Sequence, residues 1–238
     1  MRVLALDTTT RAGSVAVVAD GEVLVERPGD AALAYAERLP AELLDALVAA
    51  GLTSADIDLF VVASGPGSFT GLRVGIASVQ GMALVHGKPV AAISALRALA
   101  EAASAGRPAG VRVAACMDAY RKDVFTAVYD VVTPATLHQV SALSIVEEPM
   151  VDLPHGTIAR WAAVGMPSVV CGDGVPLCAA LWPAAMEVVP VPLLAGILGR
   201  LACARADSVV VVPPSGAQPL YVRRPDVEVK RDADAARS

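Results

Sequence analysis

The sequence is poor in charged residues, in aromatic residues and in the side chains that bind metal ions. Of 238 residues, 18% are charged and 4% are aromatic, and the net charge at pH 7 is −5. An acidic balance without a basic patch argues against a protein that binds nucleic acid by itself. The three histidines lie far apart in the sequence and show no paired spacing, so we expect no metal site.

The sequence also lacks closely paired cysteines and long uninterrupted apolar runs. The four cysteines form no C-x-x-C pair and lie in apolar segments, which predicts buried, reduced thiols rather than disulfides. The most apolar late segment, "VVPVPLLAGILGRLACA", is interrupted by Pro190, Pro192 and Arg200, so we expect no membrane span. The opening "MRVLALDTTT" is too short an apolar run for a signal peptide. We therefore expect a cytoplasmic protein that does not contact membranes.

The abundant apolar residues, 55% of the chain, fall into alternating strand and helix patterns. Three short apolar runs within residues 2–27, two of them joined at Asp20-Gly21, predict an antiparallel start with a hairpin. Helices are predicted over about 32–50 and 71–86, and a buried strand ends near Gly65 between them. In the first helix, Pro40 should lie in the first turn or produce a kink. The pattern is typical of an α/β protein.

The chain also shows a topological repeat. Asp7 and Asp118 each end an apolar strand and precede a second strand. This predicts two lobes of one architecture related by duplication. We place the N-terminal lobe, with its partner-binding helices, at 1–104 and the C-terminal lobe at 105–225. The last helix, at about 191–206, should pack back toward the N-terminal lobe, and 226–238 should be a frayed tail.

The glycine-rich stretch "ASGPGSFTGLRVGIASVQG" resembles a phosphate loop but does not match one. Gly71 is followed by Leu72 and Arg73 rather than by Lys-Ser/Thr, and the glycines are out of register with G-x-G-x-x-G. We favour a structural use, in which Ser68 or Thr70 caps the helix. The alternative is that free N–H groups at the helix start, with Arg73 nearby, hold an anion.

The helix over 71–86 is apolar on nearly every side. One stripe is fully apolar, and a neighbouring stripe of mostly small residues contains Gly71, Gly75, Ser78 and Met82. An outer helix of a small lobe needs only one apolar face, so this helix should be covered twice. A partner's helix or the rest of this chain would serve equally well, and both alternatives stay open.

The segments "GPGSFTGLRVGIASVQGMAL" and "LALDTTTRAGSVAVV" strongly resemble the TsaB family, also called YeaZ, of bacterial tRNA threonylcarbamoyladenosine biosynthesis. "AERLPAELLDAL", "MDAYRKDVFTAVY", "VVCGDG" and "QPLYVRRPDV" resemble later landmarks of the family, so the resemblance covers nearly the whole chain. Tyr35 is a departure, because the family usually has a histidine there.

The resemblance implies a two-lobed actin-like, sugar-kinase and Hsp70-like (ASKHA) fold with duplicated ribonuclease H-like lobes. Nucleotide-binding members carry Asp-x-Gly-Thr in the first hairpin, whereas this chain has a threonine in place of that glycine. Its Cβ should crowd the approach of a phosphate. We therefore expect no catalytic residue, no metal and no cofactor of its own, although ATP could bind at the boundary with partner subunits. The residues of a vestigial nucleotide or anion site would be Asp7, Thr8, Thr9, Ser68, Arg73 and Asp118. In the structural alternative, Asp7 and Asp118 simply cap turns.

The resemblance further implies a non-catalytic subunit that forms a heterodimer with TsaD and recruits the ATPase TsaE. TsaD would then modify the adenosine beside the anticodon of tRNAs that read codons beginning with A. We expect tRNA contact only through the complex, and a homodimer when TsaD is absent. The expected interface residues are Leu47, Gly71, Leu72, Gly75, Ser78, Val79 and Met82. The alternatives are a small-molecule kinase of the same superfamily and a peptidase that acts on TsaD.

Overall fold

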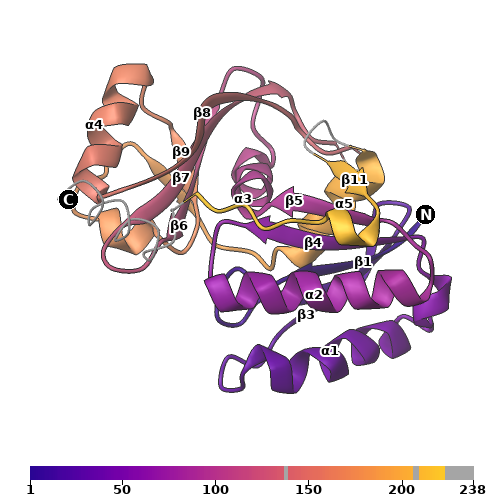
Figure 1. The fold of residues 1–238 in the computed structure, drawn as a ribbon. Coiled ribbons are helices and arrows are strands. Elements are labelled where there is room, and N and C mark those ends of the chain that lie inside the picture. Colours follow the sequence, from indigo (N-terminus) through magenta and orange to yellow (C-terminus); the bar gives the residue numbers. More distant parts are fainter. Residues whose placement is uncertain (137–138, 206–208, 223–238) are drawn as a thin grey trace, which may run out of the picture.

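A computed structural model describes residues 1–136, 139–205 and 209–222 of the chain. The predicted tail at 226–238 and the end of the predicted C-terminal lobe lie outside these residues. The first sheet has the order β11-β5-β4-β1-β2-β3 and the second the order β10-β9-β6-β7-β8 (Figure 1). The strands are β1 (Arg2–Asp7), β2 (Ser14–Ala19), β3 (Glu22–Pro28), β4 (Leu59–Gly65), β5 (Val90–Ser94), β6 (Arg112–Asp118), β7 (Val124–Thr133), β8 (Ala142–Asp152), β9 (Val169–Cys171), β10 (Glu187–Val189) and β11 (Val210–Val212). The helices are α1 (Tyr35–Ala49), η1 (Ser54–Asp56), α2 (Phe69–Val85), α3 (Ala95–Ser104), α4 (Pro154–Val164), η2 (Val175–Cys178), α5 (Ala195–Ala204) and η3 (Pro214–Gly216).

The first sheet begins with the predicted antiparallel strands β1, β2 and β3. Asp20 and Gly21 have φ values of 50° and 87°, as a two-residue hairpin with matching twist requires. After this hairpin, β4 pairs parallel to β1 and β5 pairs parallel to β4. Parallel neighbours need a crossover, and α1 and α2 provide these two connections.

The second sheet repeats this topology, as the repeat in the sequence predicted. Strands β6, β7 and β8 are antiparallel, β9 pairs parallel to β6, and β10 pairs parallel to β9. Each of the five strands therefore has a counterpart among β1 to β5. The duplicated two-lobed α/β architecture is confirmed.

The core is continuous between the two sheets. Helices α1 and α2 cover one face of the first sheet, and α3 and α5 cover the other (Figure 1). Helix α3 also packs on β6, β7 and β9, and one apolar cluster includes residues from both sheets. Helix α5 packs on β1, β2 and β4, and β11 adds an antiparallel strand beside β5. The chain thus returns to the first lobe well before residue 225, where we had placed the end of the second.

Helices α1 and α4 and strand β11 are among the elements that differ from the sequence-based expectations. Helix α4 was not predicted, because Gly156 and β-branched residues weaken its helical pattern. It forms around Trp161, which is fully buried and stacks on Trp182 with ring centroids 5.4 Å apart. Strand β11 was also missed. Pro40 lies inside α1, beyond its first turn. Within the described ranges, no helix has the length and apolar character needed to cross a bilayer.

Candidate functional site

The carboxylate of Asp7 is engaged within its own turn. Asp7 is 3% exposed, and its Oδ1 accepts hydrogen bonds from Thr9 N at 2.8 Å and from Thr9 Oγ1 at 2.6 Å. Burial raises the pKa of Asp7, while the bonds from Thr9 act in the opposite direction. This geometry is an Asx turn, in which a short polar side chain satisfies backbone N–H groups two residues on. The structural alternative for Asp7 therefore has direct support.

The glycine-rich loop packs directly on this turn. Ser68 N donates to Thr9 O at 2.9 Å, and a Cβ built at Gly67 would lie 2.5 Å from the same oxygen. Ser68 Oγ accepts from Gly71 N at 3.2 Å, so Ser68 is the N-cap of α2. The predicted cap is confirmed, with Ser68 rather than Thr70 in that role.

Thr9 occupies the space next to Gly67, where a phosphate would have to approach the loop backbone. Arg73 is also engaged elsewhere: its guanidinium lies 3.9 Å from the ring centroid of Phe69, and its Nε donates to the Tyr221 hydroxyl at 3.1 Å. Among the described residues, no group of three or more candidate ligands could hold a metal ion. These observations favour the structural interpretation of the loop over the anion-binding alternative.

The second lobe carries an equivalent turn after β6. Asp118 Oδ1 accepts from Tyr120 N at 2.7 Å, and Asp118 N donates to Asp173 Oδ1 at 3.0 Å. Burial raises the pKa of Asp173, and the charge of Asp173 adds to the increase in the pKa of Asp7. Sequence reasoning missed Asp173, although the "GDG" of "VVCGDG" follows β9 as the glycine-rich loop follows β4. The second sheet thus brings Asp173 to the Asp118 turn, a contact that their spacing in the sequence did not indicate.

Five of the seven expected interface residues face the chain's own interior. Leu47, Leu72 and Val79 are at most 1% exposed. Cβ atoms built at Gly71 and Gly75 would lie 2.3 Å from Thr8 O and 2.2 Å from Thr8 Oγ1. The expectation that these five contact a partner is corrected, because they have no surface to offer. The two glycines of the small-residue stripe let the turn of the same chain approach α2.

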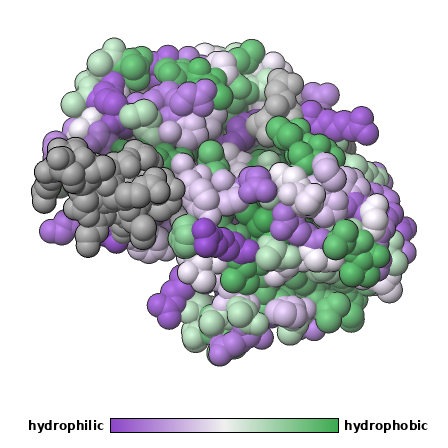
Figure 2. All heavy atoms as spheres, viewed as in Figure 1, coloured by the Kyte–Doolittle hydropathy of each residue, from purple (hydrophilic) through white to green (hydrophobic). Residues whose placement is uncertain are grey.

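Ser78 and Met82 do reach the surface, where they help to line an apolar groove between α1 and α2. This groove, called the α1–α2 groove below, has a volume of about 410 Å³. Its lining residues are Pro40, Leu43, Leu44, Ser54, Ser78, Gly81, Met82, Val85 and His86. Among the lining residues, Leu44 and Val85 are 57% and 78% exposed, and Val48 on α1 and Leu84 on α2 are 75% and 72% exposed. Figure 2 shows hydrophobic residues on this side of the first lobe.

One polar contact at the groove joins a serine and a histidine, the nucleophile and base of serine hydrolases. His86 Nε2 lies 2.8 Å from Ser54 Oγ. Distant segments bring the two residues together, so their spacing in the sequence gave no signal.

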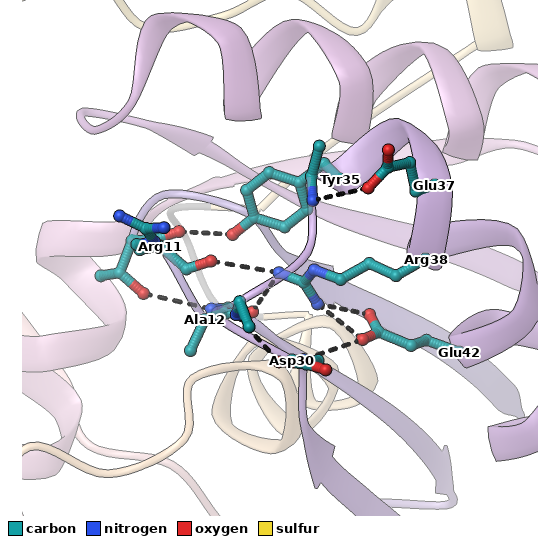
Figure 3. A network of polar contacts seen from close by, with 11 residues as sticks. Arg11, Ala12, Asp30, Tyr35, Glu37, Arg38 and Glu42 are labelled. Atoms are coloured by element: carbon teal, nitrogen blue, oxygen red, sulfur yellow. Dashed lines mark hydrogen bonds and ion pairs between the residues drawn. The ribbon is translucent and has the colours of Figure 1, made fainter.

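Tyr35, at the position where the family usually has histidine, lies at the start of α1. Its hydroxyl donates to Thr10 O, and Arg38 lies over its ring (Figure 3). Burial raises the pKa of Tyr35, so the hydroxyl keeps its proton as a donor.

Two lobes of one topology, each with an aspartate turn after its first strand, define an α/β protein of the two-lobed ASKHA class. The family model described as "TsaD: tRNA N6-adenosine threonylcarbamoyltransferase" matches residues 25–160. The "tRNA threonylcarbamoyladenosine biosynthesis protein TsaB" of Escherichia coli K12 is 31% identical over 94% of this chain and 95% of its own length. Its Haemophilus influenzae namesake is 36% identical over 52% of each chain.

The solved structure "YeaZ from Pseudomonas aeruginosa" has a TM-score of 0.73 and is 28% identical, covering 92% of this chain and 99% of its own. The chain belongs to the TsaB (YeaZ) family of tRNA threonylcarbamoyladenosine biosynthesis proteins.

Proposed function

We propose that the chain is a cytoplasmic, non-catalytic subunit that binds TsaD through the α1–α2 groove and whose complex with TsaD recruits TsaE. The observation that carries this proposal is the groove with its exposed apolar border. Apolar patches of this kind, bordered by polar residues, mark protein–protein interaction sites. In this complex, TsaD would carry out the modification, and tRNA and ATP would bind to the assembly rather than to this chain alone.

The Asp7 turn supports the non-catalytic part of the proposal. The carboxylate that would serve a metal-bound water in an active relative accepts two hydrogen bonds from Thr9. Thr9 also fills the space above Gly67. A kinase of the same superfamily would need the Asp7 carboxylate and the backbone at Gly67 to be accessible to a nucleotide. The kinase alternative therefore loses support.

The shape of the groove supports a partner that presents apolar helices. Two exposed helices side by side can be closed by two helices from a partner, as in a four-helix bundle. A second copy of this chain offers the same surface, which supports a homodimer when TsaD is absent.

The proposal is tested by a charge in the groove that the free chain tolerates. A Cβ at Gly81 would meet no atom within 4 Å, so Gly81→Glu should fold normally. A charge buried without a partner costs several kcal/mol, and each 1.4 kcal/mol lowers affinity about tenfold. We expect Gly81→Glu to abolish both the TsaD complex and the homodimer in size-exclusion chromatography with light scattering.

The matched control is Ala77→Glu, which places the same charge on an exposed position of α2 outside the groove. This variant should assemble like the wild type. If Gly81→Glu is folded and assembles as well as Ala77→Glu does, the partner does not bind the groove and the proposal is wrong.

The peptidase alternative has one observation in its favour, the Ser54–His86 contact. A serine hydrolase also needs a group that orients the base and donors that stabilise an oxyanion. Among the described residues, no acidic side chain is seen to hydrogen-bond to His86. We therefore expect TsaD to stay uncleaved with both the wild type and Ser54→Ala. Cleavage of TsaD that depends on Ser54 would restore the peptidase hypothesis.

A further inference from the structure

Arg38 is the centre of a buried polar network that joins α1 to the turn between β1 and β2 (Figure 3). The residue is 5% exposed. Its Nη1 contacts both carboxylate oxygens of Glu42 at 2.6 Å. Its Nη2 donates to Ala12 O at 2.6 Å and to Arg11 O at 3.1 Å. Because one guanidinium bonds both a helix and a turn, it fixes their relative position.

Tyr35 extends the same connection by one residue. Its hydroxyl donates to Thr10 O, and the Arg38 guanidinium lies 4.3 Å from its ring centroid. Three consecutive carbonyl groups of the turn therefore accept hydrogen bonds from α1. Tyr35 donates to the carbonyl of residue 10, and Arg38 donates to those of residues 11 and 12. These bonds are directional, whereas the apolar contacts between α1 and α2 permit sliding and rotation.

The other side of the turn is attached to the start of α2. Thr9 O accepts from Ser68 N, and Thr8 lies against Gly71 and Gly75. The turn thus connects α1 and α2, the two helices that form the groove.

The loop that enters α1 belongs to the same network. Glu42 Oε1 accepts from Asp30 N at 3.0 Å, and Arg11 Nε donates to Ala31 O at 2.8 Å. The Arg38 guanidinium lies against the backbone of Gly29, where a Cβ would be 1.7 Å from Nη1. The position of α1 is therefore determined at its N-terminal half by groups that do not reach the groove.

We propose that Arg38, together with Tyr35, is a positioning residue for partner binding: it holds α1 at the angle to α2 that gives the α1–α2 groove its shape. This inference rests on the proposed function. Arg38 is too buried to touch a partner, so its effect must pass through α1. When only a fraction of molecules has the competent groove, the apparent dissociation constant rises by the inverse of that fraction.

The chain contains a matched control in Arg97 on α3. Arg97 is 7% exposed, contacts Glu101 at 3.0 Å with the same four-residue spacing, and donates to Ser141 O at 2.9 Å. It lies between the two sheets rather than at the groove. Loss of Arg97 therefore removes the same two kinds of bond, one to a carboxylate four residues on and one to a distant backbone carbonyl, without changing α1.

The test compares Arg38→Met, Arg97→Met and Tyr35→Phe. Thermal unfolding gives the stability of each variant, and calorimetric titration with TsaD, below every unfolding transition, gives its affinity. We expect both methionine variants to unfold at lower temperature. Arg38→Met should bind TsaD about tenfold more weakly or worse, which is about 1.4 kcal/mol. Tyr35→Phe, which loses one bond, should show a smaller loss, and Arg97→Met should bind within about twofold of the wild type.

Each outcome has one meaning. If the wild type does not bind TsaD, the proposed function fails first. If the wild type binds and Arg38→Met binds equally well, or Arg97→Met weakens binding as much, then Arg38 contributes stability alone and the inference is overturned. Should Arg38→Met not fold, Tyr35→Phe and Arg38→Lys decide in its place. Lysine keeps the charge beside Glu42 but lacks the planar fork, so equal affinity for both of these variants would also refute the inference.

Discussion

The two aspartate turns have the same local bonds but different surroundings. In both, the aspartate Oδ1 accepts from the N–H two residues on, at 2.8 Å for Asp7 and 2.7 Å for Asp118. The first turn is covered by α1 and α2. In the second turn, residues 120–122 adopt left-handed φ values of 57–73°, and Tyr120 is 51% exposed. The aspartate turn thus has the same geometry in both lobes, although different elements pack on it in each.

The helices explain this difference between the lobes. The first lobe places α1 between β3 and β4 and α2, of 17 residues, between β4 and β5. At the matching positions of the second lobe, the described chain has α4, of 11 residues, and η2, of four. A long helix can cover its turn with one face and present another to a partner. Among the described residues, the helices at these two positions are longer in the first lobe, which supports a binding surface there.

The largest effect is expected from filling the space between α2 and the first turn. A Cβ at Gly75 would lie 2.2 Å from Thr8 Oγ1, whereas Gly81 on the same helix is open. Gly75→Ala should therefore destabilise the fold by about 1–3 kcal/mol, as overpacking does. Gly81→Ala should stabilise it by roughly 0.5–1 kcal/mol, because alanine has less backbone entropy to lose. Urea unfolding of both variants measures the difference, and equal effects would show that α2 does not press on the turn.

A second effect concerns the pH dependence of the buried carboxylates. Because burial raises the pKa of Asp7 in the folded state, folding favours its protonated form. The free energy of unfolding should therefore decrease as pH rises from the unfolded pKa, about 3.9, through the raised folded pKa. Asn keeps an acceptor for Thr9 and does not titrate. The stability of Asp7→Asn relative to wild type should thus increase with pH over this window, by about 1.4 kcal/mol per unit of pKa shift.

Asp173→Asn provides the comparison in the second lobe, since burial raises the pKa of that carboxyl as well. Chemical unfolding at a series of pH values between 3.5 and 7 measures both variants. A relative stability that does not change with pH would mean that Asp7 is solvated.

In a tRNA modification assay with TsaD and TsaE, Asp7→Asn should remain active, and loss of turnover with an intact complex would show that Asp7 is catalytic.

The smallest effect is expected at the helix cap. Ser68 Oγ accepts one hydrogen bond from Gly71 N at 3.2 Å. Ser68→Ala should lower the free energy of unfolding by about 0.5–2 kcal/mol, the usual contribution of a cap, and leave modification largely intact. A loss of modification by several orders of magnitude, with folding and TsaD binding preserved, would show that this loop takes part in the chemistry.

The sequence alone determined the features that depend on neighbouring residues. The hairpin at Asp20-Gly21 was predictable because both residues tolerate positive φ. A hydroxyl cap at Ser68 or Thr70 was predictable because a side-chain oxygen there lies near the next N–H groups, and the structure selects Ser68. The duplicated order of strands could also be read, since strand and turn signals recur along the chain. The long central motif was sufficient to indicate the family.

Only the tertiary structure decided which face of α2 meets which neighbour. Periodicity cannot distinguish the faces of a helix that is apolar on nearly every side. Gly71 and Gly75 were therefore assigned to a partner, whereas they face Thr8, a residue far away in the sequence. The hydrogen bond from Asp118 N to Asp173, the pairing of β11 with β5 and the network around Arg38 have the same origin. Each joins segments that local propensity treats as independent, and the sheets bring them together only when the whole chain has folded.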